Sequence, residues 1–215
     1  MGGIFNMDSP LMQGLSRVAD MVVLNLMTVL CSIPVFTAGA AETALYDATT
    51  RMLRDEGNLY SGFWRAFRSN FKQATGLWLI ILVAGLLVSG SVLFYLTWEI
   101  SGGIVLLVIA GALLMLWAVT AAWVFPLQAR FENSVKNTLK NAVLCAMAYL
   151  PRSLVMAVLN LLPLALFLVM PDLFLRIGFI WLGIWFALAA YFNCRLLKKP
   201  MDKLIAQAEA RQAQE

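Results

Sequence analysis

Two long stretches without a charged residue decide which class of protein this chain can form. Residues 75–97 read TGLWLIILVAGLLVSGSVLFYLT, and residues 103–126 read GIVLLVIAGALLMLWAVTAAWVFP. About 18 consecutive apolar residues let a helix cross the hydrocarbon core of a bilayer, and both stretches exceed that length. Composition agrees, since 61% of the 215 residues are hydrophobic and 13% are charged, against about 25% charged residues in soluble domains. The chain is therefore predicted to be an integral membrane protein.

Three further apolar segments bring the number of predicted spans to five. The expected fold is all-α and polytopic, a single membrane domain over residues 1–215 with amphipathic helices on its cytoplasmic side. The predicted spans cover residues 15–36, 75–97, 103–126, 150–170 and 173–195. The predicted interface helices cover residues 38–54, 63–74 and 131–142.

The distribution of Lys and Arg predicts how these spans are oriented. Basic residues gather in residues 37–73, in residues 127–149 and in the C-terminal tail, whereas residues 1–16 and the connections 98–102 and 170–172 contain none. Cytoplasmic loops of membrane proteins carry the excess of Lys and Arg. The pattern therefore predicts an N-terminus outside and a C-terminus in the cytoplasm.

The stretch SIPVFTAGAAETALYDA, residues 32–48, joins the first span to a new helical pattern. Pro34 cannot continue a helix, so it is predicted to end the span. Thr37 is predicted to cap the next helix, whose small first turn, residues 38–41, lets another backbone approach closely. Whether the new helix lies in the membrane interface or enters the membrane is left open.

Helical periodicity separates the charges of this second helix into two faces. At 100° per residue, Glu42 lies on the apolar face, opposite a charged face predicted to be solvated. The pairs Asp47–Arg51 and Arg51–Asp55, each four residues apart, are predicted to support that charged face. Glu42 then has two open interpretations. In the first it belongs to a polar functional site or a coupling surface, and in the second it is a structural carboxylate that caps a neighbouring helix or reaches water.

Two segments of the chain form a weak internal repeat. FWRAFRSNFKQA, residues 63–74, aligns without gaps on FENSVKNTLKNA, residues 131–142. Each has an apolar stripe suited to a helix lying in the inner interface, and the alternative is chance similarity between two basic amphipathic helices. Their exposed cations are a candidate surface for docking a partner: Arg65, Arg68, Lys72, Lys136 and Lys140.

Four of the polar residues inside the predicted spans are candidate functional or structural positions. Asp20 and Arg176 are placed at similar outer depth, so they are expected to pair if their spans touch. Asn25 and Asn160 fall near the middle of their spans, where amides hydrogen-bond across helices. A solute pathway lined by these two amides is the alternative.

The residues needed for catalysis or metal binding are scarce in this chain. It has no histidine, and its cysteines (Cys31, Cys145 and Cys194) are widely separated. It lacks a phosphate-binding Gly-x4-Gly-Lys-Ser/Thr loop and a Gly-x-Ser-x-Gly elbow. The sequence therefore predicts no enzyme, no cofactor, no metal and no nucleic-acid partner, with the lipid bilayer as the main environment.

Three blocks follow one another along the chain: NLMTVLCSIPVFTAGAAETALYDA, FWRAFRSNFKQATGLWL and VKNTLKNAVLCAMAYLPRSL. Their content and order resemble the YesL family of bacterial membrane proteins. The resemblance implies a small helical protein of the bacterial plasma membrane, of poorly defined function, often encoded beside genes for carbohydrate uptake and polysaccharide degradation. It transfers no catalytic residues.

Two functions follow as expectations. The first is an accessory or permease-like component of carbohydrate uptake, working with ABC-type sugar transporter subunits or as a homo-oligomer. The second is a membrane scaffold or regulatory partner of another complex, with no transport activity of its own.

Overall fold

All regular structure in the described residues, 10–98 and 103–212 of this computed structural model, is helical. Five helices are long and apolar enough to cross a membrane, which confirms the predicted fold class. The elements are α1 (Pro10–Ser32), the 3₁₀ turn η1 (Val35–Thr37), α2 (Ala38–Leu53), α3 (Leu59–Thr97), α4 (Gly103–Arg130), α5 (Val135–Ala148), α6 (Leu150–Val169), α7 (Pro171–Arg176), α8 (Gly178–Ile180), the π-helical turn η2 (Trp181–Trp185) and α9 (Phe186–Gln212).

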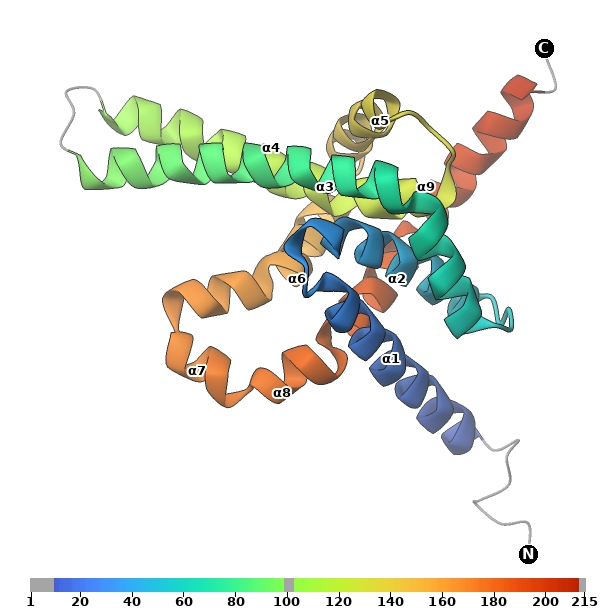
Figure 1. Cartoon of the computed structure of the whole chain (residues 1–215). Helices are drawn as coiled ribbons and strands as arrows, with labels where there is room; N and C mark the ends of the chain where they lie inside the picture. Colours follow the sequence, from blue (N-terminus) through green and yellow to red (C-terminus); the bar gives the residue numbers. More distant parts are fainter. Residues whose placement is uncertain (1–9, 99–102, 213–215) are drawn as a thin grey trace, which may run out of the picture.

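The longest feature of the molecule is the antiparallel pair α3 and α4 (Figure 1). The indole Nε1 of Trp117 donates to the carbonyl of Ile81 at 2.9 Å, and a Cβ on Gly85 would lie 2.5 Å from the same indole ring. The outer faces stay uncovered, with Leu87 68% and Val108 67% exposed. Such surfaces are stable only against lipid or another apolar partner.

Helix α3 is longer than a membrane is thick. Its 39 residues give a helix of about 58 Å, against about 30 Å for the hydrocarbon core. The N-terminal part of α3 turns away from the line of the rest (Figure 1), with Phe63 buried and stacked on Phe67. The segment 63–74 is thus the first part of one continuous helix.

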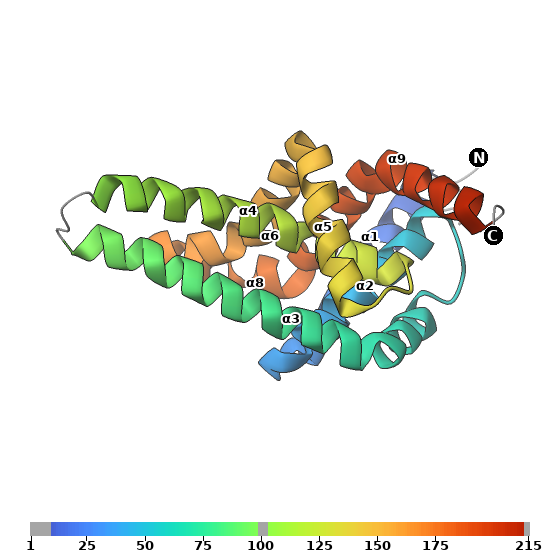
Figure 2. The same cartoon turned by 90° about the horizontal axis from the view of Figure 1, so that it is seen from above.

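The second repeat segment folds differently from the first. Residues 131–134 are not helical, and α5 begins at Val135, with Ser134 Oγ accepting from the backbone N–H of Asn137 at 3.4 Å. Helix α5 runs across α4 (Figure 2) and ends before Tyr149, where α6 begins in a new direction. The two units therefore share an amphipathic pattern without sharing a fold.

Helix α2 lies at the centre of the bundle, packed against α1, α3, α4 and α9 (Figures 1 and 2). Ala40, Ala41 and Ala44 have no exposed surface. A Cβ on Gly39 would lie 2.5 Å from both the carbonyl oxygen of Ala74 and the Cβ of Trp78. The predicted close approach at this small first turn is confirmed, and α2 is far more buried than its charged face indicates.

Thr37 stands at the N-cap position of α2, as predicted, but its side chain does not cap the helix. Its hydroxyl instead donates to the carbonyl of Pro34 at 2.7 Å. This bond stabilises the turn after α1, where Pro34 prevents the helix from continuing and leaves carbonyl groups without helical donors.

One of the two ion pairs predicted on α2 is present. Arg51 contacts Asp47 at 2.8 Å, but its second partner is Glu56, at 3.5 Å. Asp55, predicted to pair with Arg51, lies beyond the end of α2 at φ 53° and pairs with Arg17 at 3.0 Å. The left-handed backbone turns Asp55 off the helical face that the periodicity assumed.

The first turns of α1 lie beside the connection between α2 and α3. Besides the Arg17–Asp55 pair, the hydroxyl of Tyr60 donates to Asp20 at 2.6 Å. The far ends of α3 and α4 lie at the opposite end of the molecule (Figure 1). The prediction that places Asp20 on the face opposite residues 55–60 is therefore wrong. The chain runs away from this end of the molecule along α1 and comes back to it along α2.

The predicted fifth span is a broken helix. Residues 173–195 begin in α7, turn at Ile177 and continue from Gly178 as one helical run whose backbone is π-helical at Trp181–Trp185. The segment from α7 to this π-helical turn is called the broken helix below. Hydropathy detects apolar length and not backbone continuity, so the sequence predicted one helix here.

Candidate functional site

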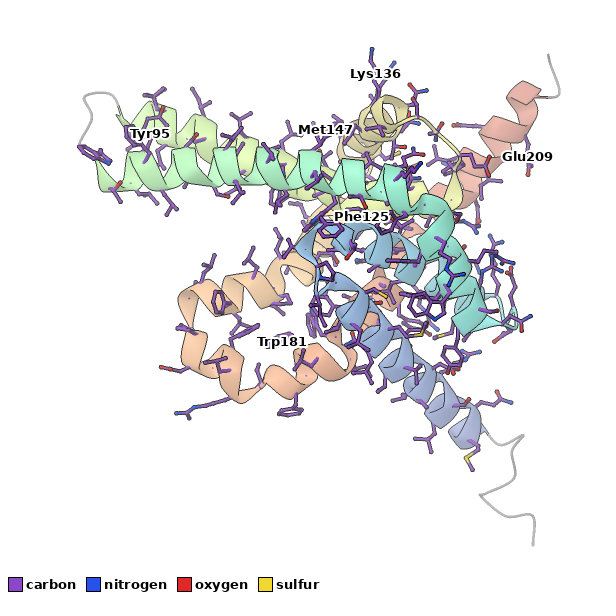
Figure 3. All side chains as sticks on the ribbon, viewed as in Figure 1. Tyr95, Phe125, Lys136, Met147, Trp181 and Glu209 are labelled. Atoms are coloured by element: carbon purple, nitrogen blue, oxygen red, sulfur yellow. The ribbon has the colours of Figure 1, made fainter. Side chains whose placement is uncertain are left out.

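A cavity of about 740 Å³ lies between α1, α2, α3, α4, α6, the broken helix and the start of α9. Its size falls within the range of about 300–1,000 Å³ typical of small-molecule sites. Figure 3 shows two of its lining side chains, Phe125 near the crossing of α3 and α2, and Trp181 on the broken helix. Most of the lining is apolar, and the polar side chains come from five residues: Thr28, Ser32, Glu42, Tyr46 and Asn160.

Glu42 is the acidic residue of this lining. In the residues that the structure describes, its carboxylate has neither a hydrogen bond nor an ion pair. Burial raises the pKa of Glu42 to about 7, because a charged carboxylate loses its hydration in this apolar setting. The sequence argument that turned Glu42 to the apolar face agrees with this position.

A hydrogen-bonded network begins one turn after Glu42. Asn193 Nδ2 donates to the hydroxyl of Tyr46 at 2.9 Å and to Asn160 Oδ1 at 2.8 Å. Burial raises the pKa of Tyr46, so its hydroxyl stays neutral. The network fixes two polar groups of the cavity wall, Tyr46 and Asn160, relative to each other.

Asn193 is the residue of this network that the sequence analysis missed. It is fully buried, and its Oδ1 atom has no hydrogen-bond partner in the described part of the chain. The available signal was a single amide within the apolar stretch ALAAYFNC, residues 187–194. Buried amides of this kind require partners, and long-range partners are not visible in a linear sequence.

Asn25 satisfies the backbone where the fifth helix is broken. Its Nδ2 donates to the carbonyls of Trp181 at 3.1 Å and Leu182 at 2.7 Å, and its Oδ1 accepts from the N–H of Ala187 at 3.1 Å. A π-helical turn leaves such groups without their usual partners. Asn25 therefore bonds across helices, as predicted, and holds the turn beside the cavity.

A second backbone group beside the cavity is freed by a proline. Pro163 has no N–H, so the carbonyl of Leu159, four residues before it, lacks its helical donor. The indole of Trp185 donates to that carbonyl at 3.3 Å. The broken helix and α6 are thus joined at the wall of the cavity.

The comparisons with known proteins give one match. Residues 21–92 match the family model described as "Protein of unknown function, DUF624". No curated protein and no solved structure matches the chain. The matched segment contains Asn25, Glu42 and Tyr46, but not α6 or the broken helix.

The predicted Asp20–Arg176 pair is wrong. Asp20 accepts from Tyr60 at the start of α3, and Arg176 is exposed on α7 with no ion pair in residues 10–98 and 103–212. The prediction assumed that α1 begins at the outer face, whereas its first turns lie beside the start of α3.

The candidate docking surface is exposed. The three cations on the N-terminal part of α3 and the two on α5 are all solvent-accessible, and Lys136 points away from the bundle (Figure 3): Arg65, Arg68, Lys72, Lys136 and Lys140. The two parts are joined beneath by Gln128 of α4, which donates to Asn70 at 3.0 Å and accepts from Thr138 at 3.4 Å. In addition, Gln73 donates to the carbonyl of Asn133.

Proposed function

We propose that this chain is a non-enzymatic protein of the bacterial plasma membrane that serves as an accessory or permease-like component of carbohydrate uptake. The observation that carries the proposal is Glu42, a carboxylate without a partner in the described residues, which opens into a cavity of about 740 Å³. The resemblance to YesL proteins, which contain a DUF624 domain, supplies the link to carbohydrates.

The cavity has the chemistry to hold a polyhydroxylated solute. Glu42 and Asn160 offer acceptors for hydroxyl groups. The hydroxyls of Thr28 and Ser32 donate to carbonyls of their own helix, at 2.8 Å each, which leaves their oxygen lone pairs for a ligand. Indole rings add apolar surface against which a sugar ring can lie: Trp78, Trp117 and Trp185.

The broken helix also supports solute binding. π-helical turns inside α-helices are frequently found at functional sites. Here the π-helical turn lines the cavity through Trp181, Leu182 and Trp185. Energy for uptake would come from a partner, such as ABC-type transporter subunits, because the sequence has no nucleotide-binding loop.

One end of the molecule carries the exposed cations of α3 and α5 and is called the basic end below: Arg65, Arg68, Lys72, Lys136 and Lys140. This end is proposed to face the cytoplasm. The first turns of α1 lie at that same end, so α1 leads away from the cytoplasmic side and α2 returns to it. Four later passes, through α3, α4, α6 and the segment from α7 to α9, bring the C-terminal helix back to that side. This places both ends of the described chain inside, in contrast to the outward N-terminus predicted from loop charges.

Glu42→Gln tests the proposal in a host that depends on this protein for growth on its cognate oligosaccharide. The change keeps the shape of the side chain and removes its charge, so growth and sugar uptake should fall while the protein level holds. Asp55→Asn is the matched control, because Asp55 is 77% exposed and asparagine tolerates its left-handed backbone. Normal uptake with Glu42→Gln contradicts a role in solute binding.

The exposed cations of α3 and α5 favour scaffolding as a second candidate function. A single-sign surface of this kind suits an acidic partner protein. Purification from native membranes distinguishes the two candidate functions. An ATPase and a permease that co-purify with this chain support a role in uptake. Any other stoichiometric partner, lost when Arg65, Arg68 and Lys72 are changed to Gln together, supports the scaffold.

A further inference from the structure

A second cavity, of about 420 Å³, lies between the C-terminal ends of α2 and α4 and the middle of α9. It is a separate space from the cavity of Glu42, and Tyr46 lines both. It therefore lies at the basic end of the molecule, where α2 ends at Leu53 and α4 ends at Arg130.

The lining of this second cavity is strongly cationic. Four basic side chains, from the C-cap of α2 and from α4 and α9, line the cavity together with one acidic side chain, Asp202. The basic residues are Arg54, Arg130, Arg195 and Lys198. The end of α2 and the helices α4 and α9 therefore direct positive charge into one concave space.

These cations are poorly neutralised by the protein itself. Arg54 contacts Glu56 at 3.8 Å, but both side chains are about half exposed to solvent. Within the described residues, Arg130 and Lys198 have no ion pair, and the guanidinium of Arg195 lies over the Tyr191 ring at 4.8 Å. Arg130 is also partly buried at the base of α4. An external anion would complete the charge balance.

We propose that this cavity binds a phosphate group, carried either by an anionic lipid headgroup of the inner leaflet or by a soluble phosphorylated compound. Arginine binds phosphate oxygens in pairs through its planar fork, and lysine adds a point charge. Basic pockets between membrane helices on the cytoplasmic side are suited to phospholipid headgroups. The volume exceeds what a bare ion fills, so the phosphate is expected to carry an organic group.

Thermal unfolding of the full chain in an uncharged detergent, followed by tryptophan fluorescence, tests this site in two arms. The first arm titrates inorganic phosphate against sodium chloride at equal ionic strength. The second arm titrates short-chain phosphatidylglycerol against phosphatidylcholine at equal lipid-to-detergent ratio. Saturable stabilisation is expected in at least one arm, and the arm that responds identifies the source of the phosphate.

Neighbouring lysines provide a matched pair of variants. Lys198 lines the cavity and Lys199 does not, although both side chains are exposed on α9. Lys198→Gln should raise the half-saturating concentration about tenfold, as expected for a lost charged contact, while Lys199→Gln should titrate like the wild type. Arg130→Gln should weaken binding further, with Arg176→Gln on α7 as its control.

Two results overturn the proposal. One is the absence of saturable stabilisation in both arms. The other is a Lys198→Gln titration that matches that of Lys199→Gln. If Arg130→Gln does not fold, the exposed Lys198 decides the question alone.

Discussion

Glu42 differs from the other acids near it in what surrounds its carboxylate. Asp47 is paired with Arg51, and Asp55 with Arg17. Glu42 has no such partner in the described residues, and an isolated ionised carboxylate is costly to bury. Because its pKa is about 7, near neutral pH the carboxyl group exchanges between a protonated form that can donate a hydrogen bond and an ionised form that only accepts.

The raised pKa of Glu42 predicts a pH dependence of stability. The native state binds this proton more tightly than the unfolded chain does. The contribution of Glu42 to the free energy of unfolding is therefore fully present below pH 4.5 and is lost as the pH rises through about 7. The loss is on the order of 3 kcal/mol. Unfolding midpoints in detergent from pH 4.5 to 7.5 should show this fall in the wild type. In Glu42→Gln that part of the slope should be missing, and identical slopes contradict the assignment.

The sequence predicted the polar residues of the cavity unevenly. Helical periodicity identified Glu42 as inward, because residues within one helix keep a fixed angular relation. Asn193 and the Asp20–Tyr60 contact depend on which helices become neighbours, and the sequence alone does not determine that. The pairing of Asp20 with Arg176 failed for the same reason.

At the scale of elements, the crossing of α2 and α3 depends on Gly39. The two backbones approach so closely that a Cβ there would lie 2.5 Å from the Ala74 carbonyl oxygen. Neither that carbonyl nor the Cβ of Trp78 can move without shifting α3. The cavity wall formed by α2 therefore depends on this contact.

Gly39→Ala should destabilise the protein by about 1–3 kcal/mol through overpacking. Gly76→Ala on α3 is the control, since a Cβ there meets nothing within 4 Å and alanine favours a helix. Denaturation in detergent should separate the two variants clearly. Equal stability for both would show that α2 and α3 do not meet as described.

The helices themselves were easier to predict than their breaks. Long apolar runs in 75–97 and 103–126 predicted α3 and α4, because apolar length is a local property. The π-helical turn at Trp181–Trp185 is stabilised by Asn25, far away in the chain. A break that depends on a distant amide leaves no clear local signal.

At the scale of the whole molecule, the arrangement of α1 and α2 determines the topology. A chain whose three cysteines are replaced can carry single cysteines at Gln13, Ser61 and Asp172. The contacts of Arg17 with Asp55 and of Asp20 with Tyr60 predict that Gln13 and Ser61 label from one side of the membrane, and Asp172 from the other. Labelling of Gln13 from the side of Asp172 would contradict these contacts and favour the outward N-terminus predicted from the loop charges.

The central claim is that the cavity beside Glu42 holds a solute, and four indoles in its wall make occupancy measurable. The purified chain is titrated with a panel of di-, tri- and tetrasaccharides while its tryptophan fluorescence is recorded. The account predicts a saturable change with at least one sugar in the wild type and in Asp55→Asn, and at least tenfold weaker binding in Glu42→Gln, since a charged hydrogen bond contributes about 1.5–3 kcal/mol. No response to any sugar, or equal binding by Glu42→Gln, would contradict it.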